Sequence, residues 1–170
     1  ADKPDAGAIV DQQAVPILPD DTAFEVFQKV TVAAELTLHR CLPALVAGNA
    51  RLMPQNLAAG SYHGRRTAAD GRIDWRAGVA SIHNLVRAVA PPYPGAFSEA
   101  GGLALRIFRS LPAPGPATAE PVLRWHAGEV QALCVDGILR LLEFELGAEI
   151  RSAAAFHERF GDASLPLTRN

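Results

Sequence analysis

Apolar residues recur every three or four positions over residues 22–47, which is the spacing of an amphipathic helix. The apolar stripe consists of Phe24, Phe27, Ala34, Leu38, Cys41, Leu42 and Leu45. Asp20 and Asp21 lie just ahead of it and can cap the free amide groups of the first turn. Pro43 is expected to kink the last turn or to start a new short helix, and Gly48 favours a stop.

Residues 8–17 precede this helix as an extended segment. Its apolar start, Ala8-Ile-Val10, suits a strand buried in a sheet, and Pro16 indicates that the strand ends near an edge. A strand followed by a helix is typical of the tail end of an α/β sheet unit.

The next part of the chain loses this periodicity. Residues 48–72 show no repeat and read as an ordered connector between domains. Residues 77–90 again place apolar side chains on one face and predict a second helix. That face consists of Val79, Ile82, Val86 and Val89. Pro91, Pro92 and Pro94 prevent its continuation.

Beyond Phe97, short apolar runs separated by glycine turns indicate β-strands. The four candidate strands cover residues 103–108, 122–125, 129–135 and 138–144. Asp136-Gly137 is a hairpin signal, residues 112–121 read as an exposed loop, and residues 152–160 predict a final short helix. Strands of this length favour a small barrel or an open sheet.

The composition is that of an ordinary folded chain of 170 residues, with 49% hydrophobic and 20% charged residues. No apolar run approaches the ~20 residues that a membrane helix needs, and the first residues do not resemble a signal peptide. Cys41 and Cys134 have no Cys-x-x-Cys neighbour, so we interpret both as small hydrophobes in a reduced compartment. The five histidines show no metal-ligand spacing. These features favour a cytoplasmic protein without a structural metal.

Charge is distributed unevenly along the chain. Residues 51–90 carry a net charge of +4, whereas residues 91–170 carry a net charge of −2. An acidic C-terminal portion argues against a long nucleic-acid-binding surface, which needs a sustained basic face. The local arginines, with Arg65 and Arg66 adjacent, suit a small anion such as a pyrophosphate.

The most informative runs are Tyr62-His-Gly-Arg-Arg-Thr67, Asp70-Gly-Arg-Ile-Asp-Trp75, Ile82-His-Asn-Leu-Val-Arg-Ala-Val89 and Pro91-Pro-Tyr-Pro-Gly-Ala-Phe97. Together with Asp5-Ala-Gly-Ala-Ile-Val10, they resemble the folate-dependent formyltransferases. Within that family they most resemble the bacterial enzymes that formylate UDP-4-amino-4-deoxy-L-arabinose in lipid A modification.

This resemblance implies an α/β plus β fold: the C-terminal end of a Rossmann-like formyltransferase domain, followed by a small OB-like β-barrel domain. The implied boundaries are 1–48 for the end of the catalytic domain, 49–69 for a linker and 70–170 for the barrel domain. The co-substrate would be 10-formyltetrahydrofolate, the acceptor the amine of a nucleotide-linked sugar, and no metal would be needed.

The same resemblance assigns Asp5 a catalytic role and the loop around it a folate-binding role. That loop comprises Ala1, Asp2, Lys3, Pro4 and Asp5. In the family the carboxylate works with an asparagine and a histidine, because a carboxylate bonded to an imidazole raises the imidazole pKa. The family's Asn-x-His-type segment is not found here, so we expect a fragment without its N-terminal part that is inactive alone.

Several alternatives stay open. Arg65 and Arg66 either bind the substrate anion or bond loop carbonyls, and Trp75 and Tyr93 suit packing better than base stacking. The parent could instead formylate methionyl-tRNA, or this chain could be a non-catalytic binding or oligomerisation module. The expected partners are a nucleotide sugar, the rest of the parent chain and a further copy in a homo-oligomer, rather than nucleic acid or membrane.

Overall fold

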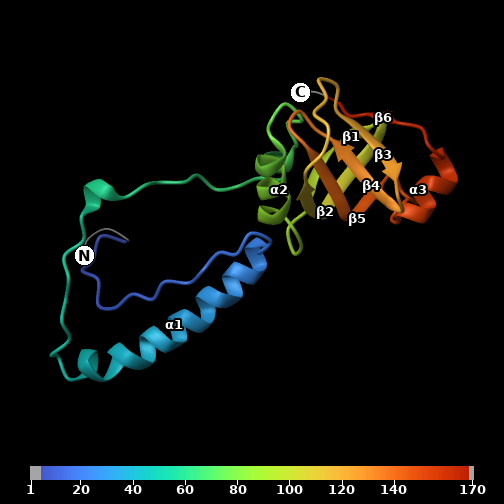
Figure 1. Cartoon of the computed structure of the whole chain (residues 1–170). Helices are drawn as coiled ribbons and strands as arrows, with labels where there is room; N and C mark the ends of the chain where they lie inside the picture. The colour runs from blue at the N-terminus through green and yellow to red at the C-terminus, as the bar shows by residue number, and fades with distance from the viewer. Residues whose placement is uncertain (1–4, 169–170) are drawn as a thin grey trace. The chain divides into compact units, whose positions relative to one another are not determined.

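The computed structural model describes residues 5–168, which form two compact units (Figure 1). The first unit comprises the described part of Ala1–Pro19 together with Glu25–Arg65. The second unit comprises Asp20–Phe24 and the described part of Arg66–Asn170.

Most of helix α1 (Ala23–Val46) belongs to the first unit, and the helix confirms the amphipathic helix expected over residues 22–47. Pro43 lies inside it. In the first unit, as far as the structure describes it, only Ala33 is buried. The apolar stripe of α1 is therefore largely exposed, which is unusual for so long an amphipathic helix.

The strand expected over residues 8–17 is not formed as a ladder. Ile9 and Met53 make one isolated antiparallel bridge, with N···O distances of 2.8 Å in both directions. Over the rest of the segment the backbone stays extended without named strand pairing among the described residues. The prediction was wrong because an apolar run becomes a strand only where a neighbouring strand supplies its hydrogen bonds.

The connector holds two short 3₁₀ turns, η1 (Leu57–Ala59) and η2 (Ala68–Gly71). Helix α2 (Val79–Ala88) follows and confirms the helix expected over residues 77–90, with each end about two residues shorter. A cis peptide bond joins Pro91 to Pro92 directly after it.

The second unit is built on a six-stranded antiparallel sheet. Its strands are β1 (Ala96–Ala100), β2 (Leu103–Ala113), β3 (Val122–His126), β4 (Glu129–Leu133), β5 (Ile138–Leu146) and β6 (Leu165–Pro166). They pair in the order β1-β2-β5-β4-β3-β6. The four predicted strands correspond to β2 to β5, but β2 runs five residues beyond the predicted end and takes in Pro112 and Ala113, which were expected to be loop. The strands β1 and β6 were not predicted.

The sheet nearly closes on itself as a barrel. After β6, the amide of Leu167 donates to the carbonyl of Pro121 beside β3, at 3.0 Å. On the other side the amide of Gly101 donates to Pro166 at 2.9 Å, and that of Thr168 donates to Glu99 of β1 at 3.0 Å. Both outer edges of the sheet are thus paired by the same short segment, which confirms the predicted barrel-like sheet.

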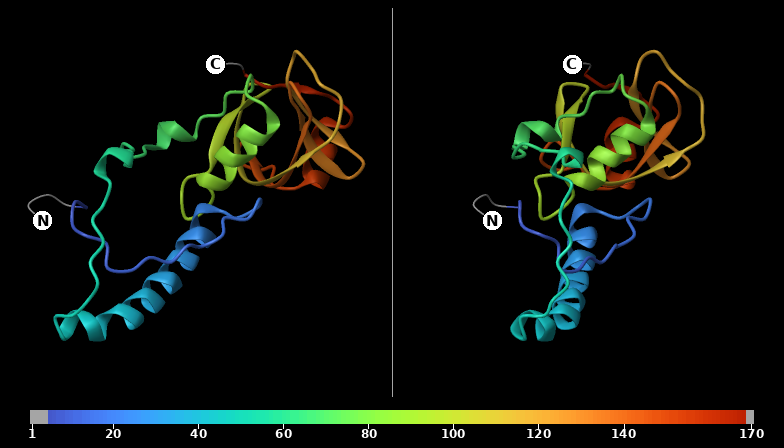
Figure 2. Two further views of the ribbon diagram at one scale, coloured as in Figure 1. Left: turned by 60° about the vertical axis from the view of Figure 1, so that its left-hand side comes forward. Right: turned by 90° about the vertical axis from the view of Figure 1, so that its left-hand side faces the viewer.

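The hydrophobic core lies inside this barrel-like sheet and under α2. Helix α2 packs on β2 and β5, while α3 (Ala153–Phe160) lies against β3 and β4, and both helices contribute side chains to the same core (Figures 1 and 2). Trp75 is fully buried, and its indole Nε1 donates to Ser98 Oγ at 2.8 Å. This confirms Trp75 as a core residue. Tyr93, by contrast, is 51% exposed and does not belong to the core.

Candidate functional site

Asp5 lies on an exposed turn and adopts a positive φ of 59°. Aspartate tolerates this left-handed backbone better than most residues. The side-chain amide of Gln55 donates to the carbonyl oxygens of Asp5, at 3.0 Å, and of Gly7. The turn is therefore fixed through its backbone, which leaves the Asp5 carboxylate exposed. The other expected folate-loop residues, Ala1, Asp2, Lys3 and Pro4, lie outside the described residues.

The two arginines of the Gly-Arg-Arg-Thr run are both exposed but fall in different units. Arg65 ends the first unit, whereas Arg66 belongs to the second and lines a pocket there with Thr67, Val89 and Tyr93. The structure thus places Arg66 on a defined concave surface within its own unit.

Thr67, next to Arg66, is held by a capping interaction that begins η2. Its amide and its hydroxyl both donate to Asp70 Oδ2, at 2.6 Å and 3.0 Å. These hydrogen bonds, the amide first, hold the pKa of the Asp70 carboxyl below its ordinary value, and the positive charge of Arg66 adds to the effect. The carboxylate therefore stays ionised at neutral pH and fixes the backbone beside Arg66.

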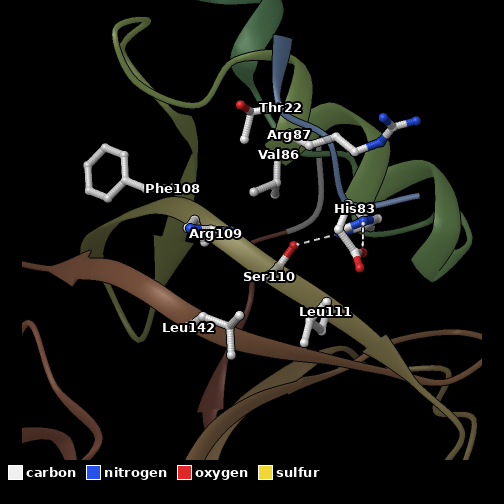
Figure 3. Close-up of a pocket in the computed structure, with 10 residues that line it drawn as sticks. Thr22, His83, Val86, Arg87, Phe108, Arg109, Ser110, Leu111 and Leu142 are labelled. Atoms are coloured by element: carbon white, nitrogen blue, oxygen red, sulfur yellow. Dashed lines mark hydrogen bonds and ion pairs between the residues drawn. The ribbon is translucent and has the colours of Figure 1, made fainter. Parts of the chain in front are cut away.

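His83 of α2 forms a polar cluster with groups far away in the sequence (Figure 3). Its Nδ1 lies 3.1 Å from Ser110 Oγ of β2, and its Nε2 lies 3.4 Å from Asp20 Oδ1. The adjoining cavity has a volume of about 30 Å³, which is enough for a water molecule and too small for a substrate. The geometry favours a structural role for this histidine.

Arg87, one turn further along α2, makes a second contact with the same segment. Its Nη1 donates to the backbone carbonyl of Asp21 at 3.0 Å, and its Nε donates to Asn84 Oδ1 at 2.8 Å. His83 and Arg87 therefore both attach Asp20 and Asp21 to the face of α2. The sequence did not predict these contacts, because Asp20 lies 63 residues before His83 and Asp21 lies 66 residues before Arg87.

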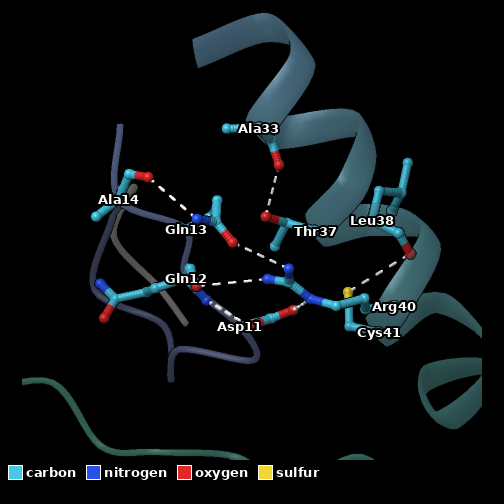
Figure 4. A network of polar contacts seen from close by, with 9 residues as sticks. All are labelled: Asp11, Gln12, Gln13, Ala14, Ala33, Thr37, Leu38, Arg40 and Cys41. Atoms are coloured by element: carbon cyan, nitrogen blue, oxygen red, sulfur yellow. Dashed lines mark hydrogen bonds and ion pairs between the residues drawn. The ribbon is translucent and has the colours of Figure 1, made fainter. Parts of the chain in front are cut away.

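Arg40 organises the polar contacts of the first unit (Figure 4). Its Nε donates to Asp11 Oδ2 and its Nη1 to Gln13 Oε1, both at 3.0 Å. The guanidinium holds the pKa of the Asp11 carboxyl below its ordinary value, and the amide of Gln12 adds to this. These contacts fix the extended segment that follows Asp5 against α1.

Residues 5–168 show neither a metal site nor a membrane-spanning helix. The described His, Cys, Asp and Glu side chains include no group of three that could hold a metal ion. Likewise, none of the helices described is long and apolar enough to cross a membrane.

A family model described as "Formyl transferase, C-terminal domain" matches residues 65–161. The match begins at the double arginine and runs through α2, the sheet from β1 to β5 and α3. It therefore covers more than half of the chain, including almost all of the barrel-like sheet.

Solved structures with a similar fold include HypX and two N-formyltransferases. A HypX variant from Aquifex aeolicus is 18% identical with a TM-score of 0.68, covering 96% of this chain and 30% of its own. The N-formyltransferase from Helicobacter canadensis, in complex with folinic acid and dTDP-3-aminofucose, is 19% identical with a TM-score of 0.62. That match covers 81% of this chain and 50% of the other.

A third structure is WlaRD, a sugar 3N-formyl transferase in the presence of dTDP and 5-N-formyl-THF. It is 18% identical with a TM-score of 0.63, and the match covers 86% of this chain and 52% of WlaRD. At such identities these similarities establish a shared fold. The chain spans from about a third to about half of the length of these proteins.

Proposed function

Because this chain belongs to the formyl transferase C-terminal domain family, we propose that it is part of an enzyme that formylates an amino sugar on a nucleotide carrier. The formyl donor would be 10-formyltetrahydrofolate. The family match over residues 65–161 carries the proposal. Two structures of the same fold support the sugar acceptor: an N-formyltransferase in complex with folinic acid and dTDP-3-aminofucose, and a sugar 3N-formyl transferase with dTDP and 5-N-formyl-THF.

In this proposal Asp5 acts through a histidine. The sugar amine attacks the formyl carbon, the carbonyl oxygen becomes an oxyanion, and the C–N bond to the folate breaks with protonation of the folate nitrogen. A carboxylate beside an imidazole favours the imidazolium and so assists the proton transfers. The histidine and the asparagine that binds the oxyanion would come from the part of the enzyme that this chain does not contain.

Among acceptors we favour UDP-4-amino-4-deoxy-L-arabinose, on the sequence runs that resemble that branch of the family. The net charge of −2 over residues 91–170 supports a small acceptor over methionyl-tRNA, because a tRNA-binding domain needs a basic face.

The proposal is tested by formyl-transfer assays on the longer enzyme and its Asp5→Asn variant. Acceptors would be UDP-4-amino-4-deoxy-L-arabinose, dTDP-3-aminofucose and charged initiator tRNA. We expect turnover with an amino sugar and a loss of about 100-fold or more in kcat on Asp5→Asn. Asp162→Asn, which changes an exposed carboxylate in the barrel unit, serves as the control.

Formylation of tRNA alone would overturn the sugar acceptor, and activity within a few-fold of the parent would overturn the role of Asp5. The 170-residue chain by itself is expected to show no turnover. Measurable turnover would contradict the idea that its catalytic partners lie elsewhere.

A further inference from the structure

A pocket in the barrel unit is lined by an exposed arginine and a half-exposed tyrosine, neither of which is part of the hydrophobic core. It has a volume of about 420 Å³, within the range of small-molecule sites. The side chains that matter for its chemistry are Arg66, Thr67, Val89, Tyr93 and Pro94. All of them belong to the second unit, so the pocket does not depend on the first.

The backbone around this pocket is fixed on both sides. On one side Asp70 accepts hydrogen bonds from the amide and hydroxyl of Thr67, which fixes the residue next to Arg66. On the other side the amide of Tyr93 donates to Ala90 at 3.1 Å, and that of Gly95 donates to Val89 at 2.8 Å. A fixed backbone lowers the entropy cost of binding a ligand.

The pocket presents one large aromatic side chain and one cation. Tyr93 is 51% exposed, although packing alone would favour burying so large a ring. The Asp70 carboxylate near Arg66 is already engaged by Thr67. An exposed ring stacks well on a planar base, and a guanidinium binds phosphate oxygens through two parallel hydrogen bonds.

We propose that this pocket binds the pyrimidine nucleoside diphosphate of the substrate, with the base on Tyr93 and the diphosphate on Arg66. The inference rests on the proposed function for the choice of ligand, and it adds a binding site and two ligand-contacting residues to it. The charge of Arg66 and the apolar wall of Val89 and Pro94 match the two halves of such a ligand. Arg65, its sequence neighbour, takes no part in this pocket.

The proposal is tested by measuring the binding of UDP and dTDP to the 170-residue chain, by NMR chemical shifts or by calorimetry. Tyr93→Ala should weaken UDP binding ~10- to 100-fold, the range expected for loss of base stacking, whereas Tyr93→Phe should keep most of it. Arg66→Ala should weaken UDP about tenfold or more and leave uridine unchanged, because uridine has no phosphate. Arg51→Ala, which removes an exposed arginine of the first unit, should have no effect.

Each result decides the proposal. It is overturned if UDP causes no change at millimolar concentration, or if Tyr93→Ala and Arg66→Ala bind UDP as the unaltered chain does. Equal weakening of UDP by Arg51→Ala would indicate unspecific attraction and would overturn it as well. UDP binding without formyl transfer by the longer enzyme would refute the proposed function alone, and formyl transfer with unaffected variants would refute the pocket alone.

Discussion

At the scale of single residues, the two cysteines show how burial determines the chemistry of identical side chains. Cys134 is fully buried, and burial, with a smaller contribution from the charge of Asp136, raises the pKa of its thiol to about 12. Cys41 lies half-buried on α1, with its thiol directed to the carbonyl of Leu38. The thiolate is the reactive form, so only Cys41 should react under native conditions.

Iodoacetamide labelling near pH 8 checks this expectation. Since a raised pKa keeps the Cys134 thiol neutral there, the native chain should take up one label, and the denatured chain two. The variant Cys41→Ser should take up none while folded. Rapid labelling of Cys134 in the folded chain would show that the core around it opens much more readily than the structure implies.

Residue types alone predicted some of these environments and missed others. Tryptophan in an apolar run predicts burial, and Trp75 is buried. The hydrogen bond between His83 and Ser110 joins residues 27 positions apart, and such a pairing depends on how a helix crosses a strand. Tyr93 has a large aromatic side chain of the kind that is often found in a core, yet the tight turn after α2 leaves its ring half exposed.

At the scale of elements, the start of α2 is capped from outside the helix. Asp136, in the turn between β4 and β5, accepts a hydrogen bond from the amide of Val79 at 2.7 Å through its Oδ1. A Cβ at position 78 would lie 2.5 Å from Asp136 Oδ2, so a larger residue there would displace this carboxylate. One carboxylate therefore joins the start of a helix to a hairpin turn of the sheet.

Asp136→Ala should lower the free energy of unfolding by about 1 kcal/mol, which is the usual cost of losing a helix cap. Urea denaturation monitored by the fluorescence of Trp75 and Trp125, which both contact the core, would measure the change. Asp162→Ala, an exposed aspartate after α3, should change stability by much less. Equal losses for the two variants would argue against the cap.

The sequence predicted α1, α2, α3 and four strands because each has a clear period. It missed β1, because the buried positions of this strand carry the small side chains of Ala96, Ser98 and Ala100 and not large apolar ones. It also missed the irregular pairing in β2, where the register with β5 shifts on either side of Arg109. That irregularity places both Ile107 and Ser110 in buried positions, three residues apart.

At the scale of the whole molecule, nearly all buried side chains of residues 5–168 belong to the second unit. Residues 51–70, by contrast, are exposed throughout. The resemblance to the formyltransferase family was predicted from sequence runs within residues 62–97, which begin in this exposed stretch. The catalytic arrangement could not be predicted, because the role proposed for Asp5 depends on neighbours in space that the sequence does not specify.

Limited trypsin digestion should therefore cut first after Arg51, Arg65 or Arg66 and leave the barrel unit resistant. Mass spectrometry should identify a stable product that begins between residues 52 and 67. Arg106 and Arg140 lie within paired strands and should be cut far more slowly. Early cleavage at either strand position would show that the sheet is less stable than its pairing suggests.

The closure of the sheet by residues 165–168 also determines when this domain can finish folding during synthesis. Until the ribosome has released that segment, β1 and β3 each keep an edge of unpaired amides and carbonyls. Such edges readily pair with other chains, so the nascent domain is most exposed to aggregation just before its last strand emerges. Within this domain, the segment that seals the barrel is made after the five other strands.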